Sequence, residues 1–522
     1  MNRDQQQNKS QNRQKNKSQS WQQNESQNKQ EIEKQSQQMI KKQNQQQLEN
    51  QNYQQNRQKN QNNEYKVKSI RLSGNVSAPS SKSELHRILI CAVLSDVETD
   101  ILCDGISDDI LATAGCLRSL GAEVDYISDR IIHIKPIKSN ICDKLIKKDD
   151  VAQPIKLNCF ESGSTLRFLL TIVTGLGIKS ELKIGETLVG RPIEELADEL
   201  CRHGARIEID ENIIKTDGRL LPGEYAIPGY ISSQYVSSLL MALPLFGGES
   251  QIKVKGNIES ESYIKMTEDV MSKFSVNVIS EEKAEKSNSE VIYMIENNNS
   301  YKSPHMIATE SDWSAASIWV AAGAISQSSI RIENLNLSSL QGDKKIISIA
   351  EDFGAKIEIE KRQLLNDKAS ESLDDDKYIH DEVDVIVPGS RNGLRGMCVD
   401  ISQTPDLAPA VAVMGVAANG TTVIENASRL RTKESDRIKS IVEMVNNLGG
   451  SAVESGDCII IKGSSGSLTG GIVNPQKDHR IAMAAAILSS ICEDDVTIED
   501  KDCVKKSYPR FWEDFEGLAG SK

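Results

Sequence analysis

One pattern recurs six times along the chain and constrains its fold more than any other feature. In each copy, a short cluster of small polar and charged residues runs directly into an apolar stretch of helix length. The six copies are Ser80–Leu94, Glu161–Leu176, Ser232–Leu245, Glu310–Ile325, Pro405–Ala418 and Asp478–Leu488. Strand-like segments such as Gln251–Lys255, Ser329–Glu333 and Thr421–Ile424 lie between them. The sequence therefore predicts a mixed α/β fold built from six copies of one unit.

The polar clusters stand where we expect the amino termini of these helices. Free backbone N–H groups and the helix dipole favour anions at such termini. Ser, Thr, Asp and Asn are also ordinary helix caps, so a single cluster indicates little. Six clusters with basic residues nearby indicate more. If the six termini face one cleft, that cleft should attract anions.

The first 64 residues differ from the rest, because Gln and Asn dominate them. Trp21 and Tyr53 are their only aromatic residues, so this segment has too little apolar surface to offset the entropy lost on ordering. We predict a disordered tail over residues 1–64 and a folded part that begins near Tyr65. A Gln/Asn-rich tract can be a self-association module. We favour the alternative, a tolerated extension.

Charge and composition exclude several classes of protein. A formal net charge of −13 argues against broad nucleic-acid binding. No apolar stretch approaches the length of a membrane span, so we expect no membrane partner. The ten cysteines are scattered singly, without a C-x-x-C pair, which favours a reduced cytoplasm and argues against a zinc site. We expect a cytoplasmic protein.

Several cations stand in otherwise apolar or Gly-rich surroundings, which is unusual for merely solubilising charges in an acidic protein. Arginine forks bind phosphate and carboxylate groups bidentately, and lysine supplies a compact charge. These cations are therefore candidate anion ligands. They are Lys82, Arg87, Arg167, Arg191, Lys433, Arg437, Arg480 and Lys506.

Two clusters add acidic residues to the cations. In the segment 433–437, we expect Lys433 and Arg437 one helical turn apart on one face, with Glu434 placed to exchange a proton. Taken alone, this segment favours an exposed, salt-bridged helix. In Asp478-His479-Arg480, the aspartate could be only a helix cap, with the other two side chains in solvent.

Eight motifs in a fixed order resemble the 5-enolpyruvylshikimate-3-phosphate synthase family. Each is moderately specific alone, whereas the ordered set is very specific and covers about residues 66 to 520. The motifs are Pro79–Arg87, Glu161–Arg167, Gly190–Ile193, Ser232–Gln234, Thr404–Asp406, Arg431–Arg437, Asp478–Arg480 and Lys506–Pro509.

The resemblance implies an architecture of two lobes with three units each, which agrees with the sixfold pattern. The first lobe would comprise residues 65–81 and 312–520, and the second residues 82–311. The ligands would bind between the lobes. The implied reaction transfers the enolpyruvyl group of phosphoenolpyruvate to the 5-hydroxyl of shikimate 3-phosphate. It releases phosphate through a tetrahedral intermediate, in the shikimate pathway of aromatic amino acid biosynthesis. We expect a monomer. One acid, one base and a cluster of cations suffice for this chemistry, so we expect neither a metal nor an organic cofactor.

The resemblance also implies roles for individual residues. Asp406 would be the base near the attacking hydroxyl, Glu434 the acid that protonates the methylene carbon, and Lys433 a contact to both. Shikimate 3-phosphate would contact Lys82, Ser83, Arg87, Ser232, Ser233, Gln234, Ser260, Asp406 and Lys433, with Tyr263 flanking the pocket. Phosphoenolpyruvate would contact Lys82, Gly163, Arg191, Gln234, Arg437, Arg480 and Lys506.

The chain departs from the family pattern at a few positions. Arg429 stands where the family often has Asn, so that substrate contact is not carried over. Ser164 and Phe168 replace the commoner Thr and Pro beside Gly163, which could reshape the donor pocket. For Asp312, we favour a helix cap over a catalytic role.

Two other interpretations remain open. The sister family, UDP-N-acetylglucosamine enolpyruvyl transferase, carries Lys-Asn after its first strand and a reactive Cys before its R-P motif. Here the pair is Lys82-Ser83, and residues 185–190 contain no Cys. The other interpretation is a Gln/Asn-driven assembly protein with a decayed enzyme core. The complete set of charged motif residues argues against it.

Overall fold

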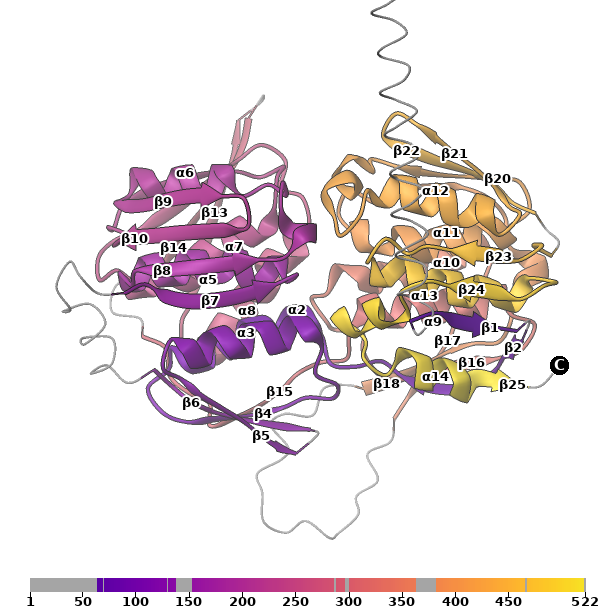
Figure 1. Cartoon of the computed structure of the whole chain (residues 1–522), viewed down its shortest axis with the longest axis horizontal. Coiled ribbons are helices and arrows are strands. Elements are labelled where there is room, and N and C mark those ends of the chain that lie inside the picture. Colours follow the sequence, from indigo (N-terminus) through magenta and orange to yellow (C-terminus); the bar gives the residue numbers. More distant parts are fainter. Residues whose placement is uncertain are drawn as a thin grey trace, which may run out of the picture. The chain divides into compact units, whose positions relative to one another are not determined.

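The structure is a computed structural model that describes residues 63–68, 70–128, 130–137, 153–285, 288–295, 300–362, 382–464 and 467–520. The predicted disordered tail, residues 1–64, lies almost wholly outside the described residues. Tyr65–Lys522 forms one unit of the chain. Its described part is a mixed α/β fold, as predicted (Figure 1).

Five four-stranded sheets share one strand order, in which the first two strands are parallel and the other neighbours antiparallel. Three of them are β15 (Met306–Ala308), β4 (Thr99–Leu102), β6 (Ile131–Lys135), β5 (Glu123–Ser128); β7 (Ile155–Phe160), β8 (Ser180–Ile184), β10 (Ile213–Gly218), β9 (Ala205–Asp210); and β11 (Glu224–Pro228), β12 (Gln251–Lys255), β14 (Asn288–Ile295), β13 (Val278–Glu285). The other two are β3 (Gly74–Ser77), β16 (Ile330–Asn336), β18 (Glu382–Val387), β17 (Glu358–Lys361); and β19 (Cys398–Asp400), β20 (Thr421–Glu425), β22 (Cys458–Lys462), β21 (Ser451–Ser455).

A sixth sheet is a three-stranded version of the same plan, in which β23 (Gly471–Val473) and β24 (Val496–Ile498) are parallel and β1 (Tyr65–Val67) is antiparallel. A short pair, β2 (Arg71–Leu72) and β25 (Ala519–Gly520), joins the two chain ends of the described part. The sheets thus repeat six times among the described residues.

Twelve α-helices are found among the described residues. In chain order these helices are α2 (Lys82–Val93), α3 (Asp108–Ser119), α5 (Gly163–Leu176), α6 (Glu194–Arg202), α7 (Ser233–Ala242), α8 (Glu261–Lys273), α9 (Trp313–Ile325), α10 (Ile346–Phe353), α11 (Ala408–Ala417), α12 (Arg437–Asn447), α13 (His479–Leu488) and α14 (Phe511–Leu518). All ten residues of α11 are buried. A helix buried on every side belongs to a core rather than to a surface.

The described apolar residues form two separate hydrophobic cores. One contains residues from Val67–Ala78 and Trp313–Leu518. The other contains residues from Leu85–Ile307. We propose that these cores belong to the first and second lobes. The two cores support the predicted lobe boundaries, residues 65–81 with 312–520 and residues 82–311, which remain a prediction.

The chain passes between the cores at two neighbouring segments that run side by side. Ser81 N donates to Glu310 O at 2.7 Å, and Asp312 N donates to Pro79 O at 2.8 Å. Strand β3 leads into α2 but pairs with β16, while β15 leads into α9 but pairs with β4. Each lobe therefore has one sheet whose edge strand is the last strand before the chain crosses to the other lobe.

The helices begin in the predicted polar clusters because those clusters cap them. The side chains of Ser81, Ser162, Asp312 and Asp478 each accept a hydrogen bond from a backbone N–H in the first turn of α2, α5, α9 and α13. The prediction that Asp312 caps a helix is thus confirmed. Such caps satisfy N–H groups that have no partner within the helix.

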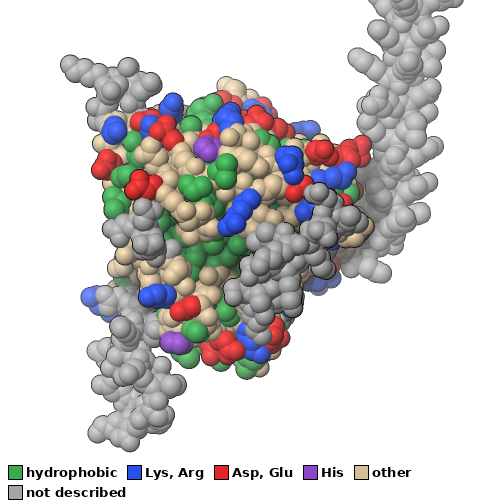
Figure 2. Space-filling model, turned by 90° about the vertical axis from the view of Figure 1, so that its left-hand side faces the viewer, with side chains coloured by type: hydrophobic (Ala, Val, Ile, Leu, Met, Phe, Trp, Pro, Cys, Tyr) green, Lys and Arg blue, Asp and Glu red, His purple; other side chains and the backbone are tan. Residues whose placement is uncertain are grey.

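The surface carries charges of both signs. Figure 2 shows acidic and basic side chains intermixed over one face of the described residues. Among these residues, no helix combines the length and the apolar character needed to cross a membrane.

Candidate active site

One pocket is lined by residues at the starts of all six helices that the sequence pattern predicted. Lys82 and Ser83 begin α2, and Gly163 and Ser164 begin α5. The other helix-start residues in the lining are Ser233 and Gln234 of α7, Ser314 and Ala315 of α9, Pro405 and Asp406 of the 3-10 helix η6 (Pro405–Leu407) before α11, and His479 and Arg480 of α13. Six helix starts therefore surround one cavity.

The lining is rich in charge, and cations prevail. Seven cations line the pocket: Lys82, Arg87, Arg167, Arg191, Arg429, Lys433 and Arg480. Four carboxylates accompany them: Asp109, Asp312, Asp406 and Glu434. An excess of cations in a chain with a net charge of −13 makes this cavity a local attractor for anions.

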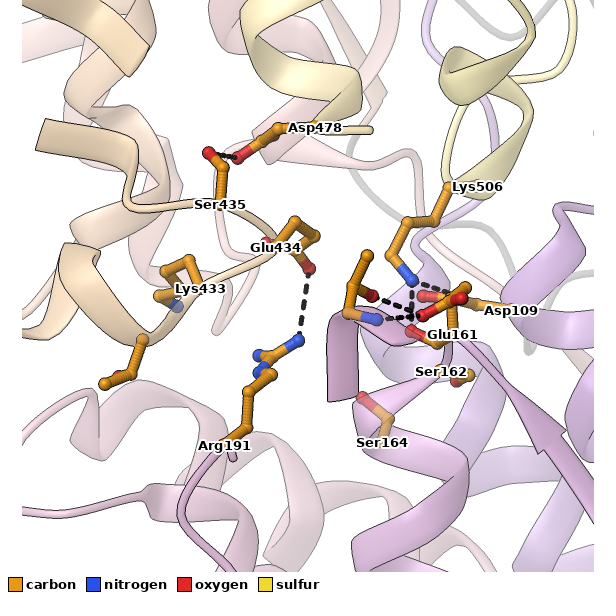
Figure 3. A network of polar contacts seen from close by, with 12 residues as sticks. Asp109, Glu161, Ser162, Ser164, Arg191, Lys433, Glu434, Ser435, Asp478 and Lys506 are labelled. Atoms are coloured by element: carbon orange, nitrogen blue, oxygen red, sulfur yellow. Dashed lines mark hydrogen bonds and ion pairs between the residues drawn. The ribbon is translucent and has the colours of Figure 1, made fainter. Parts of the chain in front are cut away.

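Asp109 joins the lysines of both lobes on one wall of the pocket. Its Oδ2 lies 2.8 Å from Lys82 Nζ and its Oδ1 lies 3.0 Å from Lys506 Nζ. Lys506 also donates to the carbonyl oxygen of Glu161 (Figure 3). Burial alone would raise the pKa of Asp109, but Lys506 and Lys82 hold it well below its usual range. Asp109 thus fixes both ammonium groups at the cavity.

Arg437 is the buried centre of the opposite wall, with a side chain that has no exposed surface. Its guanidinium contacts Asp406 Oδ1 at 2.8 Å, Glu434 Oε2 at 2.6 Å and Asp478 Oδ2 at 2.8 Å. The alternative of an exposed, salt-bridged helix in this segment is therefore wrong.

The expectation that Lys433 and Arg437 lie one turn apart on one helix face is also wrong. Asp436 accepts a hydrogen bond from the N–H of Lys439, so α12 begins only at Arg437. Lys433 precedes the helix in an extended conformation and follows the 3-10 helix η7 (Ser428–Thr432). Because of this cap, the helix begins four residues later than the charge spacing suggested.

Asp406 is held by three cations. Its carboxylate lies 2.8 Å from Arg437, 3.2 Å from Arg480 and 3.3 Å from Lys433. Burial raises the pKa of Asp406, but these cations outweigh it and hold the pKa well below its usual range. Burial lowers the pKa of Lys433 to about 8, against the opposing effect of Asp406. Asp406 is therefore ionised, and Lys433 exchanges its proton close to neutral pH.

Glu434 reaches across the pocket toward the second lobe. Its Oε1 lies 3.9 Å from Nη1 of Arg191, which points at it from the other side (Figure 3). Burial alone would raise the pKa of Glu434, but Arg437 and Arg191 hold it well below its usual range. In this state Glu434 is an ionised carboxylate between two guanidinium groups.

The departures from the family pattern take part in the walls of the pocket. Ser164 Oγ accepts a hydrogen bond from Gln234 Nε2 at 2.9 Å, and Arg167 Nη1 donates to Gln234 Oε1 at 3.0 Å. Phe168 is fully buried, and the Arg87 guanidinium lies over its ring at 5.1 Å. The two departures therefore fix the orientation of Gln234 and Arg87.

The structure brings most of the predicted site residues to this cavity. Those that line it are Lys82, Ser83, Arg87, Gly163, Arg191, Ser232, Ser233, Gln234, Ser260, Tyr263, Asp406, Lys433, Glu434 and Arg480. Arg437 and Lys506 are not in the lining. Each is buried directly behind the lining and is bonded to a carboxylate that lines the pocket. His479 and Arg480 also lie in the lining, so the alternative that they are solvated surface residues is wrong.

Sequence reasoning missed Asp109 and left Arg429 without a role. Asp109 stands in the first turn of α3, where an acidic residue is ordinary, so the sequence carried no distinguishing signal. Arg429 lines the cavity and donates to Ser260 Oγ at 3.0 Å. The sequence did mark Arg429 as unusual, because a cation stands there where the family often has the amide of Asn.

Comparisons with known proteins identify the family of this chain. The family model described as EPSP synthase (3-phosphoshikimate 1-carboxyvinyltransferase) matches residues 67–515. A relative from Clostridium kluyveri named 3-phosphoshikimate 1-carboxyvinyltransferase is 37% identical over 456 residues, which is 87% of this chain and 97% of the relative. A relative of the same name from Clostridium perfringens is 38% identical over 453 residues, covering 86% and 97%.

Solved structures show the same fold. EPSP synthase from Acinetobacter baumannii superposes with a TM-score of 0.67 at 21% identity, covering 87% of this chain and 98% of that one. The enolpyruvyl transferase NikO from Streptomyces tendae superposes with a TM-score of 0.61 at 15% identity, covering 88% and 97%. The chain therefore belongs to the EPSP synthase (3-phosphoshikimate 1-carboxyvinyltransferase) family of transferases.

Proposed function

We propose that this chain transfers the enolpyruvyl group of phosphoenolpyruvate to the 5-hydroxyl of shikimate 3-phosphate within the pocket between the lobes. The observation that carries the proposal is the pairing of a cation-rich lining with two partly buried carboxylates, Asp406 and Glu434. Both substrates are anions, so the cations supply affinity. The two carboxylates supply the acid and the base that the reaction needs.

Shikimate 3-phosphate binds against the second lobe. Arg87, Ser232, Ser233 and Ser260 offer hydrogen-bond donors on that side of the cavity. Arg87 is preorganised, because its Nε donates to Thr267 Oγ1 at 2.7 Å and its ring contact fixes the guanidinium plane. On the first lobe, Asp406 and Lys433 then face the hydroxyl that attacks.

Phosphoenolpyruvate binds among the cations that surround Glu434. Its phosphate and carboxylate groups meet Lys82, Arg191 and Arg480, with Arg437 and Lys506 directly behind. The ligand anions compete with Glu434 for the guanidinium groups that now hold its pKa low. Binding of the donor therefore raises the proton affinity of Glu434, which makes it an acid when it is needed.

The chemistry then proceeds in two stages. Glu434 adds a proton to the methylene carbon, positive charge builds at the adjacent carbon, and the acceptor hydroxyl attacks it while Asp406 takes the hydroxyl proton. In the tetrahedral adduct, the carbon–oxygen bond to phosphate breaks and the methyl group returns a proton to Glu434. The surrounding cations stabilise the departing phosphate.

Release of inorganic phosphate from phosphoenolpyruvate tests the proposal directly. The purified protein should release phosphate with shikimate 3-phosphate as acceptor and none with UDP-N-acetylglucosamine. The named curated relatives do not favour the UDP-sugar alternative. Turnover with the UDP-sugar alone would contradict the proposal. A lack of turnover with either acceptor would favour the decayed-core alternative.

We further propose that the protein acts in the cytoplasm, as a monomer and without a metal or organic cofactor. Both lobes of one chain contribute to the lining, so one copy contains a complete pocket. Gel filtration with light scattering checks the oligomeric state, and turnover in the presence of a chelator checks the metal.

A further inference from the structure

The segment Ile258–Glu261, which leads into α8, carries an unusual helix start. Ser260 occupies the cap position of α8 in a left-handed conformation, with φ at +56°. Its side chain accepts no capping hydrogen bond from the helix. A non-glycine residue in this conformation is strained, so its surroundings must hold it there.

The missing cap comes from the other lobe. Gln403, between β19 and η6 of the first lobe, accepts a hydrogen bond from Glu261 N through Oε1 at 3.3 Å. Its Nε2 donates to Ile258 O at 3.0 Å. One amide group therefore bonds the backbone on both sides of Ser260. A cap residue normally satisfies the first N–H groups of its own helix, whereas here a distant residue does so.

A second residue of the first lobe holds the same segment. Arg429 Nη1 lies 3.0 Å from Glu259 Oε2 and donates to Ser260 Oγ at 3.0 Å. Because the Ser260 hydroxyl accepts from Arg429, its own proton is free to be donated elsewhere. Ser260 lies in the pocket lining, so an anion bound there is an available acceptor.

We propose that Gln403 and Arg429 are positioning residues that form a clasp between the lobes and orient Ser260 toward the acceptor. The clasp comprises these two residues and the segment Ile258–Glu261. The proposal rests on the proposed function, in which Ser260 contacts shikimate 3-phosphate. Because Gln403 stands three residues before Asp406, the clasp also links the acceptor's contact in the second lobe to the base in the first. Acceptor affinity then depends on a residue that does not touch the acceptor.

Another ion pair between the lobes provides a matched control. Lys477 Nζ lies 2.8 Å from Glu186 Oε2, but the two side chains are 57% and 87% exposed. Neither residue lines the pocket. An exposed pair of this kind contributes little to stability. Its removal therefore reports the effect of losing one contact between the lobes without disturbing Ser260.

The test compares Gln403→Ala with Lys477→Ala in the full chain by steady-state phosphate release. Gln403→Ala should raise the acceptor KM about fivefold, the scale of one lost hydrogen bond. Its kcat, donor KM and melting temperature should stay within error of the parent. Lys477→Ala should leave all four quantities unchanged.

A double-mutant cycle distinguishes positioning from general loosening. The cycle combines Gln403→Ala with Ser260→Ala. On the proposal, both substitutions act through the Ser260 hydroxyl, so Gln403→Ala should raise the acceptor KM no further in a Ser260→Ala background. Arg429→Lys should also raise the acceptor KM, because an ammonium group lacks the fork that reaches two partners.

Three results would overturn the clasp: additive effects in the cycle, an equal rise in both KM values, or a Gln403→Ala variant that behaves like Lys477→Ala. A parent protein that releases no phosphate would instead refute the proposed function. The two failures are therefore distinguishable.

Discussion

Glu84 offers the sharpest quantitative prediction, because it is a buried carboxylate at the crossing between the lobes. Its side chain is 4% exposed, and it stands two residues after Lys82 in α2. Oε2 accepts from Glu310 N at 2.8 Å, and Oε1 lies 3.3 Å from Lys273 Nζ. Burial raises the pKa of Glu84 from 4.5 to about 7, although Lys273 opposes the shift.

The sign and the size of the effect follow from proton linkage. The folded chain binds this proton more tightly than the unfolded chain, so the contribution of Glu84 to stability falls as the pH rises from 4.5 to 7. The full shift corresponds to about 3 kcal/mol, of which about 2.5 kcal/mol falls between pH 5 and pH 8. Glu84→Gln cannot ionise, so its free energy of unfolding should lack this decline.

The assay is chemical unfolding followed by far-ultraviolet circular dichroism, for both proteins at pH 5 and pH 8. The stability of Glu84→Gln relative to the parent should rise by about 2.5 kcal/mol between the two pH values. Asp269→Asn is the matched control, because Asp269 bonds the same Lys273 but is 42% exposed. Its difference from the parent should change by less than about 0.5 kcal/mol. A Glu84→Gln difference that does not depend on pH would refute the reasoning.

Four further predictions concern the pocket. Glu434→Gln and Asp406→Asn should each lower kcat about 100-fold or more, the scale of a general acid or base. Calorimetry should still detect acceptor binding to Glu434→Gln. Near-normal turnover in either variant would remove the substituted residue from the mechanism. Because the pKa of Lys433 is about 8, kcat/KM should fall as the pH rises through that value, and Lys433→Arg should move this decline to higher pH. A β-carbon at Gly163 would lie 2.9 Å from Arg167 Nη1, so Gly163→Ala should displace that guanidinium and raise the donor KM. Glyphosate, which carries a phosphonate and a carboxylate like the donor, should compete with phosphoenolpyruvate and inhibit Gly163→Ala less; inhibition that the donor cannot relieve would contradict this pocket.

Local signals in the sequence predicted the parts of the fold that are determined locally. Ser81, Ser162 and Asp478 cap helices where the polar clusters predicted helix starts. The sixfold repeat was visible because every unit needs an apolar helix behind such a cluster. The pairing of β3 with β16 and of β15 with β4 was not visible in the residues themselves, because pairing between strands distant in sequence leaves no mark on either strand; only the resemblance placed residues 65–81 in the first lobe.

The candidate site divides in the same way. The surroundings of the cations and of Glu434 indicated candidates, and the resemblance added Asp406 and gave the residues their roles. It could not identify Asp109, whose position in a first turn is ordinary for a helix. Gln403 was equally hidden, because the N–H group that it caps belongs to the other lobe, 142 residues away along the chain. Contacts between residues of different lobes can be identified only from the three-dimensional structure.

The distribution of charge explains why the pocket needs its carboxylates even before chemistry begins. Seven cations facing one cavity would repel one another. Asp109, Asp406 and Glu434 each pair with two or more cations that line the cavity or lie directly behind the lining. Bound substrate anions can pair with those cations. Each such pairing weakens the attraction between the cations and a carboxylate, and so raises the pKa of that carboxylate. For Asp406 three cations surround the group, so it stays ionised and suited to a base. For Glu434 the two guanidinium groups are those that the donor would engage, so on the proposed mechanism its proton affinity rises only when phosphoenolpyruvate is bound. The acid is then active only in the loaded pocket.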